Sequence, residues 1–153
     1  MKKIALLVVV LAVAVAGLAV AQAKPDFSGK WAPKVDPNAA PPAGGGGRGG
    51  MGGGPMTITQ TAAELKMERT MGENTMTTVY KLDGTESINK TQRGESKSTA
   101  KFEGGKLLIK TVSEGAQGPQ ETTAAWSLSA DGKELTMVTT TARGERTMTY
   151  TKQ

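Results

Sequence analysis

Apolar and polar residues alternate with a period of two from Met56 to the end of the chain, and this pattern constrains the fold more than any other feature. A period of two places one side of each strand in the core and the other in water. Threonine is frequent on the polar side, and its branched Cβ favours an extended backbone. The pattern therefore predicts an all-β protein. The alternating runs are 56–60, 65–69, 76–82, 100–103, 107–110, 124–129, 135–137 and 148–151.

Short breaks with turn-forming residues separate these runs. Glycine supplies the positive φ of tight hairpins, so each break predicts an antiparallel pair of neighbouring strands. We interpret 61–65 as a hairpin loop rather than a helical turn. The spacing predicts an antiparallel up-and-down meander of about 8–10 strands. The glycine-containing breaks are Asp83-Gly84, Gly104-Gly105, Asp131-Gly132 and Arg143-Gly144-Glu145.

A meander of this size loses its exposed edges when it closes into a lipocalin-like barrel, which favours the barrel over a curled open sheet or a two-sheet sandwich. The alternation also fixes the register, because a shift of one residue would place polar side chains in the core. The residues predicted to face inward are Ile58, Leu65, Met67, Tyr80, Leu82, Phe102, Leu107, Ile109, Trp126, Leu128, Leu135, Met137, Met148 and Tyr150.

Residues 1–23 have the three parts of a secretory signal peptide. Lys2 and Lys3 precede an uncharged apolar run over 4–20, and Ala21-Gln22-Ala23 matches the small-x-small cleavage pattern. The apolar run approaches the minimum length of a membrane anchor, but the cleavage pattern favours export. We expect a mature chain that begins at Lys24, does not insert into a membrane, and is periplasmic or secreted.

The mature chain has the length of one domain. We expect 24–35 to supply the first strand of the barrel, 36–55 to be a Pro/Gly-rich flexible loop, and 56–153 to complete the barrel domain. The glycine-rich loop has few side chains to bury, so burial cannot offset the entropy that ordering the loop would cost. It contains Gly45-x-Gly47-x-x-Gly50, the dinucleotide-binding spacing, but no strand precedes it and no helix follows, so we predict no nucleotide there.

The composition excludes several chemistries. The chain has no His and no Cys, which removes Ser-His-Asp and Cys-His catalysis and the common zinc and haem sites. Its methionines lie mostly on the apolar sides of the runs, where methionine is an ordinary core residue. Its glutamates lie beside turns or on the wet sides. A net charge of +5 on a mixed-sign sequence does not indicate nucleic acid. We predict no catalytic residue, no metal and no cofactor.

Gly29-Lys30-Trp31 resembles the Gly-x-Trp motif on the first strand of the calycin and lipocalin-like families. The resemblance implies that Trp31 lies across one end of a barrel and that Arg146 or Lys152, on the last strand, covers it. Two segments, Phe27–Trp31 and Trp126–Leu135, are also similar to exported bacterial β-barrel proteins, a likeness that implies no particular activity.

These observations predict an exported, non-enzymatic barrel, expected to be a monomer, that binds a small apolar ligand or a protein partner. The alternative is a periplasmic inhibitor or envelope interaction protein that acts through its loops, including 36–55. The side chains predicted to line a ligand site in the barrel interior are Trp31, Tyr80, Phe102, Trp126 and Tyr150.

Overall fold

The structure is a computed structural model that describes residues 24–34, 54–91, 94–115 and 118–153. The predicted signal peptide and nearly all of the predicted loop at 36–55 lie outside these residues. The described chain is all β and antiparallel, as predicted. Its strands are β1 (Gly29–Pro33), β2 (Met56–Gln60), β3 (Glu64–Met71), β4 (Asn74–Lys81), β5 (Glu86–Thr91), β6 (Gly94–Glu103), β7 (Lys106–Gly115), β8 (Gly118–Leu128), β9 (Glu134–Thr141) and β10 (Gly144–Lys152).

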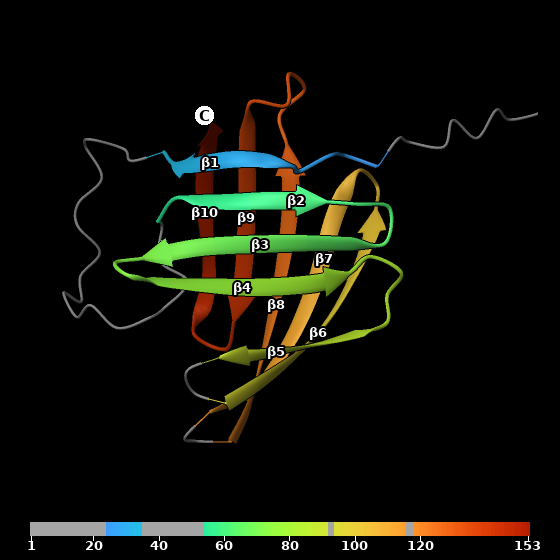
Figure 1. Cartoon of the computed structure of the whole chain (residues 1–153). Helices are drawn as coiled ribbons and strands as arrows, with labels where there is room; N and C mark the ends of the chain where they lie inside the picture. The colour runs from blue at the N-terminus through green and yellow to red at the C-terminus, as the bar shows by residue number, and fades with distance from the viewer. Residues whose placement is uncertain (1–23, 35–53, 92–93, 116–117) are drawn as a thin grey trace, which may run out of the picture.

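The ten strands form one sheet in the order β4-β3-β2-β1-β10-β9-β8-β7-β6-β5. Pairing of β1 with both β2 and β10 places Trp31 beside Met56 and Lys152 and joins the first described strand to the last. Figure 1 shows β1 to β4 across the front and β6 to β10 behind them at a steep angle, so that the sheet rolls into a nearly closed barrel. Residues 24–34, 54–91, 94–115 and 118–153 include no helix of membrane-spanning length and hydrophobicity.

Most of the predicted hairpins are confirmed. The breaks at 104–105, 131–132 and 143–145 join β6 to β7, β8 to β9 and β9 to β10, which are paired neighbours. The loop at 61–63 likewise joins β2 to β3, with the Thr61 N–H donating to the Glu64 carbonyl at 2.8 Å.

The pairing predicted across Asp83-Gly84 is wrong. This turn connects β4 and β5, which are the two ends of the strand order instead of paired neighbours. The Gly84 N–H donates to the carbonyl of Ala100 on β6 at 3.0 Å, and Asp83 Oδ1 accepts the Thr85 N–H at 2.9 Å. The turn is therefore tied toward β6, and β5 runs back beside β4 without forming a backbone ladder with it.

Side chains of β5 hydrogen-bond the backbone of β4 where a ladder is missing. The Val79 N–H donates to Asn89 Oδ1 at 2.8 Å, and Asn89 Nδ2 donates to the Val79 carbonyl at 2.9 Å. The Lys81 N–H donates to Ser87 Oγ at 2.7 Å. We call this junction of Val79, Lys81, Ser87 and Asn89 the β4–β5 seam. In β5 the polar residues Ser87 and Asn89 are buried and the apolar residue Ile88 is exposed. This is the reverse of the usual alternation, so the sequence pattern does not predict this strand.

All of the residues predicted to face inward are buried in the core or packed against it, which confirms the predicted register. Phe27, just before β1, joins them and is 0% exposed. Its ring stacks on Phe102 with centroids 6.4 Å apart and meets Trp126 edge-on at 6.0 Å. Its carbonyl accepts the Trp31 indole N–H at 2.9 Å. Phe27 therefore plugs the interior at the end where the N-terminal segment enters.

The interior has two halves that differ in burial. The plugged half surrounds Phe27, and its inward side chains are buried. The accessible half lies toward the opposite turns, and its inward side chains are only half-buried, so water reaches them. The plugged half consists of Phe27, Leu65, Leu82, Leu107, Trp126 and Leu135, and the accessible half of Arg69, Met76, Thr111, Thr122, Thr139 and Met148.

Candidate functional site

Arg69 is a charged side chain on the inner face of β3. It follows Leu65 and Met67 at a period of two, so its side chain enters the barrel, where it is half-buried. Its Nη2 lies 3.6 Å from Met56 Sδ and 3.5 Å from the Tyr150 hydroxyl oxygen. Its Cζ is 5.9 Å from the centroid of the Tyr150 ring. The guanidinium thus spans the interior from β3 to β10.

Besides Met56, three further methionine side chains lie on the inner face near this guanidinium. Met76 is the register partner of Arg69 on β4, and Met148 Sδ lies 3.9 Å from the Tyr150 hydroxyl. Met137 is paired with Met148 on the neighbouring strand. Thioether side chains are unbranched and polarisable, so they adapt to apolar partners of varied shape. The site therefore combines one positive charge with an adaptable apolar wall.

Tyr80 borders the site from β4. Burial raises the pKa of Tyr80 to about 12, and the positive charge of Arg69 acts in the opposite direction. The Tyr80 phenol is therefore protonated at neutral pH, and the fixed charge of the site comes from Arg69.

Hydroxyl groups line the side of the interior opposite Arg69. Ser98 Oγ and Thr111 Oγ1 share a hydrogen bond of 2.8 Å, and Ser96 Oγ donates to the Asn89 carbonyl at 3.3 Å. Thr122 and Thr139 continue this inner surface on β8 and β9. The accessible half is therefore apolar and cationic near β3 and β10 but polar near β5 to β9.

The five residues predicted to line a ligand site fall into two groups. Trp31, Phe102 and Trp126 contact Phe27 and belong to the packed aromatic core. Tyr80, edge-on to Trp126 at 6.0 Å, and Tyr150 reach toward Arg69. Contact of any of them with a ligand remains a prediction.

The cover expected over Trp31 is present. Lys152 Nζ lies 5.5 Å from the centroid of the Trp31 ring, whereas Arg146 is exposed nearer the far end of β10. The resemblance to the Gly-x-Trp families implied that Arg146 or Lys152 covers Trp31, and Lys152 is the residue that does so.

Arg69 was missed from the sequence although the signal was present. Leu65, Met67 and Arg69 share one parity, so the alternation that placed the first two inside also places the third inside. Phe27 was missed as well, because it lies outside the alternating runs.

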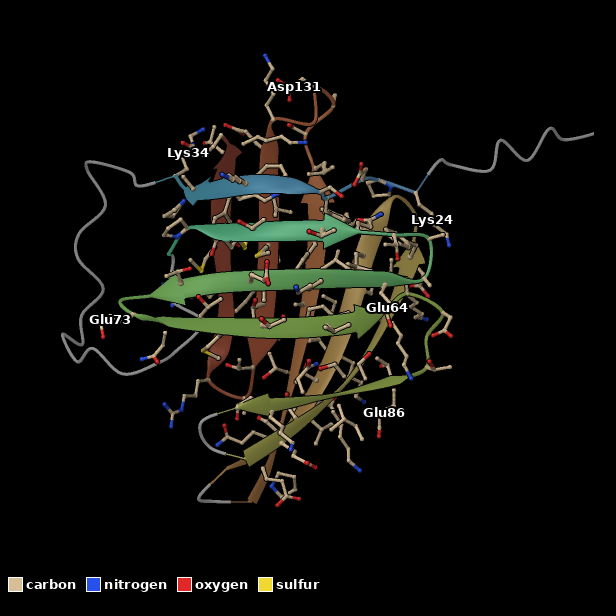
Figure 2. All side chains as sticks on the ribbon, viewed as in Figure 1. Lys24, Lys34, Glu64, Glu73, Glu86 and Asp131 are labelled. Atoms are coloured by element: carbon tan, nitrogen blue, oxygen red, sulfur yellow. The ribbon has the colours of Figure 1, made fainter. Side chains whose placement is uncertain are left out.

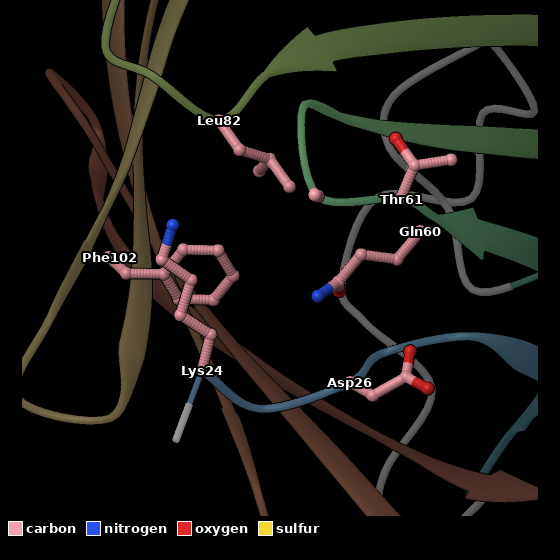
Figure 3. Close-up of a pocket in the computed structure, with 7 residues that line it drawn as sticks. Lys24, Asp26, Gln60, Thr61, Leu82 and Phe102 are labelled. Atoms are coloured by element: carbon pink, nitrogen blue, oxygen red, sulfur yellow. The ribbon is translucent and has the colours of Figure 1, made fainter. Parts of the chain in front are cut away.

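A pocket of about 290 Å³ opens at the plugged end of the barrel, where the N-terminal segment enters. Figure 3 shows Phe102 and Lys24 on one side of it and Gln60, Thr61 and Asp26 on the other. Lys24 Nζ is 5.5 Å from the Phe102 ring centroid.

The lining of this pocket is already engaged in holding the N-terminal segment. Gln60 Nε2 donates to the Pro25 carbonyl and Gln60 Oε1 accepts the Phe27 N–H, both at 3.0 Å. Hydrogen bonds from Ser28 lower the pKa of Asp26. We therefore assign these polar groups to closing the barrel end.

A second pocket, of about 340 Å³, is lined by residues of β1 to β4 that include Lys30, Thr57 and Glu68. The charged side chains labelled in Figure 2 lie at turns and on the outside of the barrel. There, Lys34 pairs with Glu134 at 2.6 Å. Among the described residues, no group of three or more His, Cys, Asp or Glu side chains is placed to hold a metal ion.

Comparison with solved structures gives neighbours for this barrel. A fatty acid transporter, REP1-NXSQ, matches with a TM-score of 0.60 and 15% identity, over 83% of this chain and 96% of its own. Secretory abundant heat soluble protein 4 from Ramazzottius varieornatus matches with a TM-score of 0.59 and 18% identity, over 85% and 96%. A fatty acid-binding protein from brain tissue of Drosophila melanogaster matches with a TM-score of 0.50 and 21% identity, over 63% and 70%.

The fold is that of the fatty-acid-binding-protein-like barrels. The expected resemblance to calycin and lipocalin-like barrels therefore holds for the fold alone. The likeness to exported bacterial proteins finds no support in these matches. No protein-family model matches the sequence, and no curated protein matches it.

Proposed function

We propose that this protein binds a small apolar ligand that carries an anionic head group, such as a fatty acid, in the accessible half of the barrel. The observation that carries the proposal is the Arg69 guanidinium, half-buried among thioethers and 3.5 Å from the Tyr150 hydroxyl. Neighbours of the same fold include a fatty acid transporter and a fatty acid-binding protein, which supports this class of ligand.

The chemistry of the two donors favours a carboxylate. A guanidinium presents N–H groups in a planar fork that matches the two oxygens of a carboxylate. The phenol of Tyr150 can rotate its proton from the sulfur of Met148 to a ligand oxygen, which is a stronger acceptor. The apolar chain of the ligand would then lie against Met76, Met137 and Met148.

Arg69→Met tests the head-group assignment. The probe is dansyl-undecanoate, and its methyl ester serves as the uncharged ligand. We expect the variant to bind the acid about 10-fold to 100-fold more weakly, because it loses a charge-assisted hydrogen bond, and to bind the ester as the unaltered protein does. Fluorescence titration of delipidated protein measures both.

Lys66→Met, which removes an equal charge from the exposed outer face of the same strand β3, is the matched control and should leave both affinities unchanged. Equal loss of acid and ester in Arg69→Met would contradict an anion site. If the unaltered protein bound neither probe, the proposed function itself would be wrong.

We also propose that the ligand is carried outside the cytoplasm, in the periplasm or the medium. The support is the sequence of residues 1–23, which lie outside the described part of the chain. N-terminal sequencing of the exported protein should begin at Lys24, and a chain that retained Met1 would contradict export.

A further inference from the structure

The β4–β5 seam is the weakest line in the wall of the barrel. Every other pair of adjacent strands in the sheet is joined by a backbone ladder, whereas β4 and β5 stand at the two ends of the strand order. Between described residues, the seam is joined by three side-chain hydrogen bonds, from Asn89 and Ser87 to Val79 and Lys81. No backbone ladder backs up these bonds at the seam.

Asn89 contributes most to this junction. Its amide satisfies both the N–H and the carbonyl of Val79, so one side chain replaces a pair of ladder hydrogen bonds. Ser87 satisfies only the N–H of Lys81. Both side chains are buried, with 8% and 5% of their surface exposed.

The residues behind the seam suit a wall that opens. Ser96 and Ser98 of β6 face Asn89 and Ser87 from the paired positions and are also buried. An apolar lining would meet water each time the strands parted, at a cost proportional to the area exposed. Serine and asparagine exchange their protein hydrogen bonds for hydrogen bonds to water at little net cost.

The seam adjoins the Arg69 site. Met76, Thr78 and Tyr80 are the inward residues of β4, and they are the register partners of Arg69, Met67 and Leu65. An outward movement of β4 would therefore displace the Met76 and Tyr80 side chains that border Arg69. The opposite end of the interior offers no comparable route, because Phe27 fills it.

We propose that the β4–β5 seam is a lateral gate to the Arg69 site and that Asn89 is its latch. The latch joins the barrel edges, and its release lets β4 move away from β5. The gating of a ligand rests on the proposed function, whereas the latch itself can be tested with no ligand.

Amide hydrogen exchange of the full chain tests the latch residue by residue. Asn89→Ala should raise the exchange rate of the Val79 amide about 10-fold, and Ser87→Ala should do the same for the Lys81 amide. The Trp126 amide, in the ladders of β8, should exchange unchanged in both variants. Asn74→Ala, an asparagine removed from an exposed position of β4, is the matched control and should change neither seam amide.

Stopped-flow binding of dansyl-undecanoate tests the gate. In Asn89→Ala, the association and dissociation rates should rise together by about the same factor as the Val79 exchange rate, and Kd should stay within about two-fold. Should Asn89→Ala fail to fold, Ser87→Ala carries the same expectation through Lys81.

Unchanged exchange at Val79 and Lys81 would overturn the latch. Faster exchange with unchanged binding rates would overturn the gate, because opening would then not limit entry. A protein that takes up no probe would overturn the proposed function and the gate with it, and the exchange data would still decide the latch.

Discussion

Leu65, Leu107 and Leu135 in the plugged half of the interior are each 0% exposed, whereas the residues four positions later on the same strands and the same inner face, Arg69, Thr111 and Thr139, are half-buried. The backbone is continuous across this change, and only the side chains differ. One half of the interior therefore supplies the buried area that holds the sheet together. The other half can hold a charged and several hydroxyl-bearing side chains, which a packed apolar core would exclude.

This contrast explains how a barrel with few large residues folds without disulfides. The chain has two Trp, two Phe and two Tyr, and no Cys. Five of the six aromatic residues are linked through Phe27, either by contact with it or by the edge-on pair of Tyr80 and Trp126. Concentrating the aromatic rings at one end gives that end a dense core and leaves the methionines and hydroxyls to line the other.

Substitutions in the two halves should differ most in stability. Trp126→Ala should lower the free energy of unfolding by about 3–5 kcal/mol, since it leaves a large cavity between Phe27 and Tyr80. Thr139→Ala, which faces inward in the accessible half, should lower the free energy of unfolding by about 0.5 kcal/mol. Ser127→Ala, which faces outward, should lower it by no more than about 0.5 kcal/mol. Denaturant titration followed by circular dichroism measures all three, and equal costs for Trp126→Ala and Thr139→Ala would erase the distinction.

Tyr80 lies between the halves and should make stability depend on alkaline pH. Its pKa of about 12 in the folded protein lies above the usual value near 10, so the folded state holds the proton more tightly than the unfolded state does. The stabilisation is complete below about pH 10 and is lost as the pH rises toward 12, by about 2–3 kcal/mol.

Tyr80→Phe should remove this part of the alkaline loss. Urea titrations at pH 9 and near pH 12 give the free energies of unfolding, and absorbance near 295 nm follows the phenolate. With only two tyrosines in the chain, subtracting the titration of Tyr80→Phe isolates Tyr80. If the Tyr80 phenol titrated near pH 10, water would reach it, and Tyr80 would have to be assigned to the accessible half.

The plugged half was far easier to predict from the sequence than the accessible half. Leu65, Leu107, Trp126 and Leu135 stand in clear alternation, and one rule, apolar inside, assigns them all. Arg69 obeys the same parity, but a charge at the end of an alternating run resembles a solvated strand end. Its meaning depends on Tyr150, which lies on β10 and is brought beside it only by the pairing of β1 with β10.

The seam could not be predicted, because it depends on closure of the whole sheet. Local turn chemistry at Asp83-Gly84 favours a hairpin, but the sheet is instead joined by the distant ladder between β1 and β10, and β4 and β5 remain its two edges. β5 also lacks the usual signal, since Ser87 and Asn89 are inside and Ile88, 59% exposed, is outside. Buried hydrogen-bonded polar residues carry no periodic apolar mark in a sequence.

The rim of the plugged half should respond less to substitution than its packed aromatic rings. Lys152 covers Trp31 from solvent with its Nζ 5.5 Å from the ring centroid, and the position of Gly29 makes this possible. A Cβ on Gly29, whose φ is +142°, would lie 2.6 Å from Lys152 Cε, so any larger residue would push the lysine off the indole.

Lys152→Met keeps the aliphatic cover and removes the charge, so the difference in unfolding free energy isolates the cation–π contact, expected at about 0.5–1 kcal/mol. Arg146→Met, on the same strand and exposed, removes an equal charge away from the indole and should change stability by less than about 0.5 kcal/mol. Tryptophan fluorescence should also shift in Lys152→Met and not in Arg146→Met, because only the first alters the surroundings of Trp31. Equal, small effects of both variants would mean that the indole is held by Phe27 and the core alone, and that the lysine stem serves only as a cover.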